Sequence, residues 1–305
     1  MPVWKGKTRG GSFGYQFFIY LIKYIGLRAA YLFQSLVIIY FIPFAPKATR
    51  SSWFYWRKIH CKNRLQALRM LYLHYYRFGQ VMMDKVAALA GFNNKFNYDF
   101  HNYDAFLDTL NGNTGVVMIG AHFGNWEIGS QFFGDYAQKL NMVMYDAEYQ
   151  KIKEKLKEVM GDNPYRVIVV NEDNWSHIFA IKEALDKKEY VCFQGDRFVS
   201  QKYILKAPFL GKEACFPAGP FQIASRFKVP VVFYFSEREG LYKYSFRFFI
   251  ADPVKRNKEM KPEQALLNQY IAVLENRIKE HPEQWFNFFP FWRKEDEKII
   301  GAIKQ

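Results

Sequence analysis

Residues 115–127 contain the side chains whose types and spacing best fit a chemical role. Their sequence is Gly-Val-Val-Met-Ile-Gly-Ala-His-Phe-Gly-Asn-Trp-Glu, so His122 is followed five positions later by a carboxylate, Glu127. An imidazole whose second nitrogen is held by a carboxylate is a general base that can deprotonate a hydroxyl. The pair therefore predicts proton abstraction. The alternative is a histidine that only satisfies a structural hydrogen bond.

Two elements have to position this pair. Residues 116–121 form a short apolar run that predicts a buried strand, and residues 126–140 begin a pattern that predicts a helix. The glycine and asparagine between them supply a turn. This order places His122 at the carboxyl end of a strand, where open α/β sheets bind ligands, and Glu127 in the first turn of the helix.

Beyond residue 90 the chain alternates strand-like and helical patterns. Such alternation predicts an α/β fold with a mixed, mostly parallel sheet covered by helices. The predicted strands are 116–121, 141–145, 167–170, 190–194, 229–236 and 244–250. The predicted helices are 126–140, 148–160, 174–187, 218–227 and 262–281.

Residues 121–127 resemble the His-x4-Asp/Glu signature of the glycerolipid acyltransferase superfamily, and more closely its lipid A late acyltransferase (lauroyl/myristoyl acyltransferase) branch. The resemblance covers roughly residues 110–292. It implies that His122, oriented by Glu127, activates an acceptor hydroxyl that attacks an acyl thioester. It also implies acyl carrier protein as donor, with acyl-coenzyme A as the alternative, a lipid acceptor, and a location on the cytoplasmic face of the inner membrane.

Residues 193–198 extend the resemblance with the sequence Phe-Gln-Gly-Asp-Arg-Phe. They follow a predicted strand, which places Asp196 and Arg197 at the same sheet edge as His122. The resemblance implies that Arg197 stabilises a phosphate or a developing oxyanion. The alternative is an ion pair between the two side chains at the surface, which contributes little to stability.

Residues 216–220, Phe-Pro-Ala-Gly-Pro, match another family segment and lead into a helix that begins near Gly219. Helix starts favour anions, although an ordinary loop is the alternative. Arg166 corresponds loosely to a further basic residue of the family site, with a surface arginine as the alternative. The candidates for substrate binding or oxyanion stabilisation are therefore Arg197, Asp196, Gly124, Asn125, Arg166 and Gly219.

Two departures from the family pattern concern the acceptor. Better-known members have an Asp-x-Asp pair where this chain has Gly-Asp-Arg at 195–197, and a basic run after Pro-Glu-Gln where this chain has Phe-Phe-Pro-Phe-Trp at 288–292. A lipid A precursor, another envelope lipid such as an amino-acid lipid, and O- or N-acylation all stay open. So does a non-catalytic membrane-associated protein of this fold. From their residue types, the aromatics of 281–292 are predicted to seal the core or to lie at a membrane interface.

The net charge of +14 is concentrated at the start of the chain. Residues 1–83 contain thirteen Lys or Arg and no acid, whereas the remainder has 30 basic against 29 acidic residues. Apolar residues in this first part occur in long runs rather than as isolated stacking rings, so we expect no nucleic-acid partner. We expect the basic residues to contact anionic headgroups instead.

Residues 16–22 and 29–44 are dominated by Phe, Tyr, Ile and Leu. The second run is about 24 Å long as a helix, whereas the hydrocarbon core of a bilayer is about 30 Å thick. Because both flanks are basic, we expect helices that lie in the cytoplasmic leaflet, with one spanning helix as the alternative. A signal peptide is disfavoured, since no small-x-small cleavage site follows. The predicted division is a membrane-anchoring region 1–48 and an acyltransferase domain 49–305.

No cofactor or metal is expected. The cysteines at 61, 192 and 215 form no Cys/His cluster with metal spacing, and their number argues against an exported protein built on disulfides. The chain also has no Gly-x-Ser-x-Gly segment, so we expect direct transfer without an acyl-enzyme.

Overall fold

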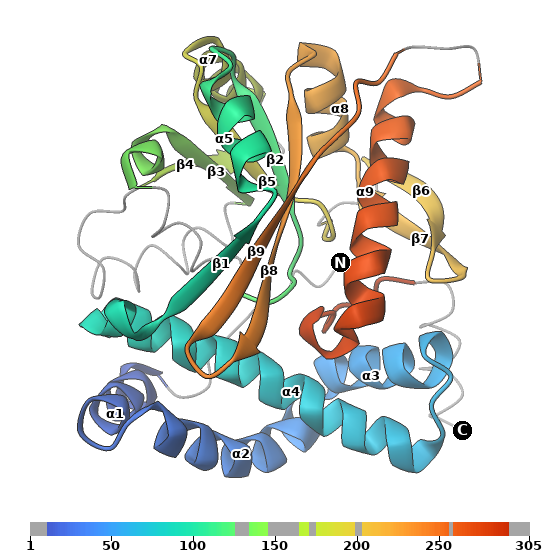
Figure 1. Ribbon diagram of the computed structural model, residues 1–305. Coiled ribbons are helices and arrows are strands. Elements are labelled where there is room, and N and C mark those ends of the chain that lie inside the picture. The colour runs from blue at the N-terminus through green and yellow to red at the C-terminus, as the bar shows by residue number, and fades with distance from the viewer. Residues whose placement is uncertain are drawn as a thin grey trace.

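The computed structural model describes residues 11–125, 134–145, 165–170, 175–198, 203–255 and 259–292. A seven-stranded sheet lies at the centre, in the order β1-β9-β8-β2-β5-β3-β4 (Figure 1). Its strands are β1 (Asn97–His101), β2 (Val116–Gly120), β3 (Leu140–Tyr145), β4 (Arg166–Val170), β5 (Tyr190–Gln194), β8 (Val231–Gly240) and β9 (Lys243–Ile250). A separate antiparallel hairpin is formed by β6 (Ile204–Phe209) and β7 (Lys212–Pro217).

The sheet is mixed and mostly parallel. Strands β2, β3, β4, β5 and β8 run in one direction, because every neighbouring pair among them is parallel. Strand β9 is antiparallel to β8, and β1 follows the direction of β9. The predicted α/β fold class is confirmed.

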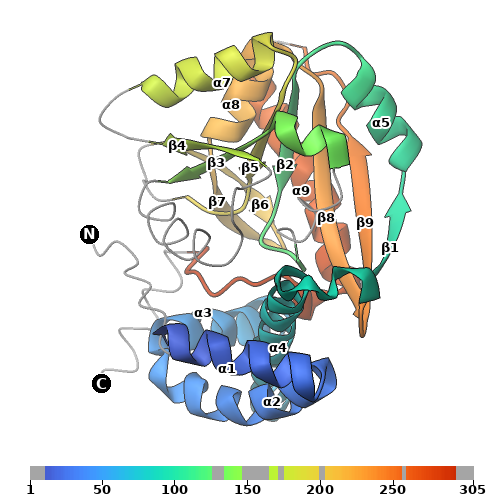
Figure 2. The same cartoon turned by 90° about the vertical axis from the view of Figure 1, so that its left-hand side faces the viewer.

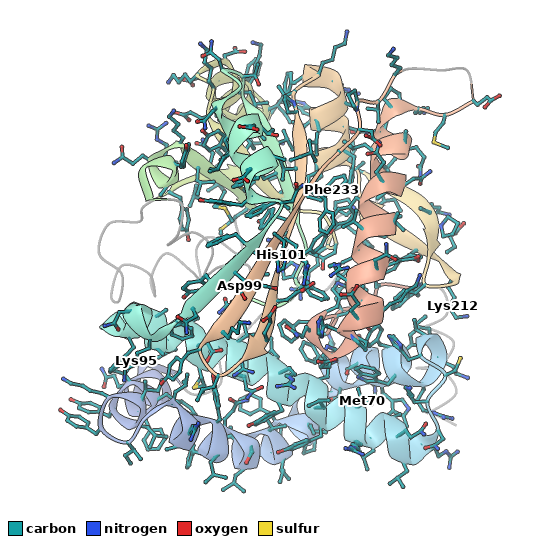
Figure 3. All side chains as sticks on the ribbon, viewed as in Figure 1. Met70, Lys95, Asp99, His101, Lys212 and Phe233 are labelled. Atoms are coloured by element: carbon teal, nitrogen blue, oxygen red, sulfur yellow. The ribbon has the colours of Figure 1, made fainter. Side chains whose placement is uncertain are left out.

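Both faces of the sheet are covered, as its apolar strands require. Alternate residues of β2 enter different cores: Val117 and Ile119 face α8 (Gly219–Phe227) and α9 (Pro262–Glu280), while Val116 and Met118 face α5 (Tyr103–Asn111). Figure 2 shows α5 on one side of the sheet and α8 and α9 on the other. Helix α7 (Ser176–Asp186) packs against β4 and β5. Phe233, labelled in Figure 3, packs from β8 against Tyr270 of α9, with ring centroids 5.5 Å apart.

The predicted elements that fall on described residues are found, with one exception. The helix predicted at 126–140 is wrong over its last part, where residues Gly134–Lys139 form the short 3-10 turn η5 and Leu140, which is buried, already begins β3. Residues 126–133 and the helix predicted at 148–160 lie outside the described residues. Strands β1, β6 and β7 and helix α5 were not among the predicted elements.

The basic N-terminal part of the chain folds into helices that lie beneath the sheet (Figures 1 and 2). They are α1 (Gly11–Tyr24), α2 (Leu27–Phe44), α3 (Pro46–Phe54), the π-turn η1 (Tyr55–Ile59) and α4 (Arg64–Ala87), followed by the short turns η2 (Ala88–Phe92) and η3 (Asn93–Lys95). Asn63 caps α4 through a reciprocal pair of hydrogen bonds with Gln66. Helix α4 crosses under the sheet, and α1 and α2 form the layer beyond it.

A buried ion pair joins these helices to the sheet. The guanidinium of Arg238 in β8 lies 3.0 Å from the carboxylate of Asp84 in α4, and both side chains are almost completely buried. The phenol groups of Tyr31 in α2 and Tyr244 in β9 donate to the same carboxylate. The four side chains satisfy one another, which a charge pair removed from water requires.

Helix α2 has two distinct faces. Its inner face packs on α4 and carries the buried side chains of Leu27, Ala30, Tyr31, Gln34 and Ile38. Its outer face exposes large apolar side chains, at Leu32, Phe33, Leu36, Ile39 and Tyr40. Within the part of the chain that the structure describes, α2 is the single helix whose length and composition would suit a membrane span.

The buried pair gives a test of stability. We expect Arg238→Met to lower the free energy of unfolding by about 3–5 kcal/mol, because it leaves the Asp84 carboxylate buried without its charged partner. The measurement is urea unfolding followed by circular dichroism. The control is Lys182→Met, which breaks an exposed pair with Asp186 on α7 and should stay within about 0.5 kcal/mol of the wild type. Equal effects of the two changes would contradict this role of Arg238.

Candidate active site

His122 lies where the register of the sheet predicts it. In the parallel pair of β2 and β5, Gly120 is opposite Gln194. His122 and Asp196 each follow these last paired residues by two positions, so the two side chains leave the same edge of the sheet side by side. This is the carboxyl edge of the parallel strands, where ligands bind in open α/β sheets.

Asp196 holds His122 from two directions. Its Oδ1 lies 2.8 Å from Nδ1 of the imidazole, and its Oδ2 accepts from the backbone N–H of His122 at 2.9 Å. The carboxylate is buried, with 2% of the side chain exposed, while the histidine side chain is 13% exposed. Asp196 was expected from the sequence at this edge, but its bond to the imidazole was not.

The charge state of Asp196 fixes the orientation of the histidine. Burial opposes ionisation of the carboxyl, but the pKa of Asp196 is still lowered, because His122, Arg197 and the indole of Trp285 stabilise the anion. An ionised carboxylate only accepts, so Nδ1 of the imidazole donates the proton of this bond. The neutral ring therefore carries its lone pair on Nε2, as a general base requires.

The loop that contains His122 is backed by residues 284–286, which follow the short turn η6 (Pro282–Gln284). Phe123 and Trp285 form an antiparallel bridge. The N–H of Phe286 donates to the carbonyl of His122 at 2.8 Å, and the N–H of Gly124 donates to the carbonyl of Gln284 at 2.9 Å. The loop and this segment thus pair as two short strands beyond the end of β2.

The Gln284 side chain secures the backing segment to the sheet. Its Oε1 accepts from the main-chain N–H of Arg238 at 2.8 Å, and its Nε2 donates to the carbonyl of the same residue at 3.0 Å. Arg238 also forms the buried pair with Asp84. The segment behind the histidine is therefore connected to the N-terminal helices through one residue of β8.

Gly124 and Asn125 both lie close to neighbouring elements of the fold. Gly124 has a φ of +57°, and a Cβ at this position would lie 1.6 Å from the carbonyl oxygen of Ser236 in β8. Asn125 is buried, and its Nδ2 lies 3.5 Å from both the carbonyl of Val81 and the hydroxyl of Tyr244. Both residues hold the turn after His122 against β8, β9 and α4.

The remaining candidates lie at different places. Arg197 is half-buried beside Asp196 and donates to the carbonyl of Phe286 at 3.0 Å. Gly219 begins α8, as predicted. Arg166 begins β4, so the parallel strands place it at the edge opposite His122, where it pairs with Glu189 at 2.6 Å. Glu127 lies outside the described residues.

Trp285 and Gln284 contact the site but were not predicted as part of it. The Pro-Glu-Gln segment with its aromatics was the available signal, yet it indicated only packing, because neither residue has a side chain typical of catalysis. Among the described residues, no group of three or more His, Cys, Asp or Glu side chains is placed to hold a metal ion.

The fold and the site define an α/β protein with a histidine–aspartate pair at the carboxyl edge of a mostly parallel sheet. A model of the bacterial lipid A biosynthesis acyltransferases matches residues 69–294, from α4 to just past Trp292, and the chain belongs to this family. The match includes His122, Asp196 and the segment that backs them, and it supports an acyltransferase activity. No curated protein matches the chain.

The close approach at Gly124 gives a second test. We expect Gly124→Ala to lower acyl transfer at least about 100-fold, because the added methyl group must displace the turn that carries His122, and small misplacements at a reacting centre have effects of this size. Gly211→Ala is the matched control: Gly211 also has a positive φ, of +79°, but its Cβ would meet nothing within 4 Å. The control should keep its activity. Equal losses would show that backbone strain, not the contact with Ser236, is responsible.

Proposed function

We propose that this protein transfers a fatty acyl chain from an acyl thioester, carried by acyl carrier protein, to a hydroxyl of a lipid A precursor or a related envelope lipid. The observation that carries the proposal is the 2.8 Å contact between His122 Nδ1 and the buried Asp196 carboxylate at the carboxyl edge of the parallel strands. Membership of the lipid A acyltransferase family supports the type of reaction.

In the proposed mechanism His122 is the general base. Its Nε2 takes the proton of the acceptor hydroxyl as the oxygen attacks the thioester carbonyl, and the thiolate of the donor leaves. The negative charge of Asp196 stabilises the imidazolium that forms. Arg197, next in the chain, is the group we assign to the oxyanion or to a phosphate of the substrate, as its guanidinium suits both. Glu127 is proposed as a further carboxylate of the site, from its spacing after His122.

We propose that α2 lies in the membrane surface and does not cross the bilayer. The inner face of α2 is fixed to α4 by polar bonds: Tyr31 joins the Asp84 cluster, Gln34 donates to the carbonyl of Tyr76 at 2.9 Å, and Tyr72 donates to the carbonyl of Ser35 at 3.1 Å. A spanning helix would have to give up these bonds or bring α4 with it. The outer apolar face of α2 suits burial at the headgroup boundary.

The distribution of charge also supports a position of α2 in the membrane surface. No acidic residue occurs before Asp84, whose carboxylate is buried in its pair, whereas Lys23, Arg28, Lys47 and Arg50 are exposed on α1 to α3. An apolar helix face flanked by unopposed basic residues complements an anionic leaflet. We therefore propose the cytoplasmic face of the inner membrane as the location.

Substitutions at the His–Asp pair test the chemistry. We expect His122→Ala to lower transfer from labelled acyl carrier protein by about 10²- to 10⁴-fold. Asp196→Asn should cause a similar loss, because an amide can donate to Nδ1 and so move the proton to Nε2. Glu127→Gln tests the second carboxylate in the same assay. Arg166→Gln, at the opposite edge of the sheet, is the control and should keep its activity. Wild-type transfer rates in His122→Ala would contradict the assignment, and lipid mass spectrometry of a deletion strain identifies the acceptor.

Substitutions on the outer face of α2 test the membrane contact. We expect the triple change Leu32→Ser, Leu36→Ser and Ile39→Ser to weaken binding to vesicles with phosphatidylglycerol at least about tenfold, because each side chain loses apolar burial. The measurement is cosedimentation with the vesicles. Phe179→Ser removes an equally exposed apolar side chain from α7 and should not change binding. Complete release of the wild type by high salt alone would contradict insertion of this face.

A further inference from the structure

Trp285 contacts the Asp196 carboxylate from a third direction. Its indole Nε1 lies 2.9 Å from Oδ2, the oxygen that also accepts from the backbone N–H of His122. The side chain is 1% exposed. This donor does not belong to the residue that Asp196 orients, so the indole of Trp285 acts on His122 through Asp196.

The main chain of Trp285 is held on both sides. It forms the bridge with Phe123, and its carbonyl accepts from Nε2 of His74 in α4 at 2.9 Å. Burial lowers the pKa of His74 to about 4, so this ring is neutral near pH 7. Because a carbonyl only accepts, the proton is on Nε2, and Nδ1 accepts from the hydroxyl of Ser52, 2.8 Å away.

The indole ring itself lies in an aromatic cluster. It packs edge-on against Tyr55, Phe209, Phe291 and Trp292, with ring centroids 5.3–5.9 Å apart. Because the main chain of Trp285 is hydrogen-bonded and its ring is enclosed, the direction of its N–H bond is fixed before any substrate binds. A donor fixed in this way can hold a carboxylate in one rotamer.

The geometry points to Trp285 as a positioning residue for acyl transfer: its indole N–H fixes the Asp196 carboxylate and takes up part of its negative charge, and so sets how strongly Asp196 favours the protonated form of His122. This role rests on the acyl-transfer function proposed above. It goes beyond that function, because Trp285 contacts none of the reacting atoms and its effect appears in the pH dependence of the reaction.

Four of the described groups around the pair keep a constant charge near neutral pH. Arg197 lies beside Asp196 and stays protonated. The charge of Asp196 acts on Tyr234 of β8 and Tyr270 of α9, and burial raises the pKa of both phenols well above the usual value, so they stay neutral. His74, behind Trp285, is neutral as well. These four groups therefore do not change the charge of the cluster in the assay range.

The test compares the same substitution at two tryptophans of one aromatic cluster. Trp285→Phe removes the N–H donor and keeps an aromatic ring. Trp292→Phe is the matched control, because Trp292 is also buried, 5.9 Å from Trp285 between ring centroids, and its Nε1 has no hydrogen-bond partner among the described residues. Thermal unfolding of both variants verifies that they are folded.

For Trp285→Phe we expect kcat to fall roughly 10- to 100-fold, the effect of losing one hydrogen bond to a charged group, with KM unchanged. The acid limb of the pH–rate profile should move to higher pH by roughly one unit. Without the indole donor, the negative charge of Asp196 is less dispersed and stabilises the imidazolium more strongly. Trp292→Phe should show neither change. A loss of kcat in Trp285→Phe without movement of the acid limb, or the same profile in both variants, would overturn the proposal.

A readout without substrate separates this proposal from the proposed function. Titration of the histidine ring nitrogens by ¹⁵N NMR, with His122 assigned by the signal that disappears in His122→Ala, should show the same upward movement in Trp285→Phe. If the protein transfers no acyl group but this movement is observed, the proposed function fails and the role of Trp285 stands. An unchanged His122 titration would overturn the role of Trp285 even in an active enzyme.

Discussion

The main-chain pairing between the His122 loop and residues 284–286 is the constraint on which the site depends. Loop and segment are separated by about 160 residues in sequence, yet they exchange hydrogen bonds at His122 and Gly124 and form a bridge at Phe123. On its other side the loop lies so close to Ser236 of β8 that there is no space for a side chain at Gly124. The pairing with residues 284–286 also brings the indole of Trp285 to the Asp196 carboxylate that orients the histidine. The pairing therefore fixes the loop and places a donor on the charged group beside it.

The same pairing is connected to the N-terminal helices. Gln284 binds both main-chain groups of Arg238, whose guanidinium lies in the buried cluster with Asp84 and Tyr31. A buried pair of this kind adds little net stability compared with apolar packing, but leaving one partner alone is costly. Its main effect is therefore specificity, because it gives α2 and α4 one favourable position on the sheet. Gln284 connects the His122 loop to the same residue, Arg238.

The sequence predicted the parts of this fold that bury apolar surface in a regular pattern. Strands β2 and β5 are short, continuously apolar runs, and α9 has helical periodicity, so their positions follow from the chain alone. Strand β1 was missed because it is an edge strand whose sequence, Asn-Tyr-Asp-Phe-His, is largely exposed and lacks an apolar pattern. A short polar strand obtains its conformation from its partner β9, which local sequence does not reveal.

The site shows the same division. His122 was predicted from a local motif, and Asp196 from its place after a strand. Their bond depends on the register of β2 and β5, and the contact of Trp285 depends on three distant segments meeting.

The order of the elements along the chain has a consequence for synthesis of the protein. Strand β9 ends at Ile250, so all seven strands have left the ribosome before the segment that completes the site. A nascent chain can therefore assemble its sheet before Trp285 docks, and until then the Asp196 carboxylate beside His122 lacks its indole donor.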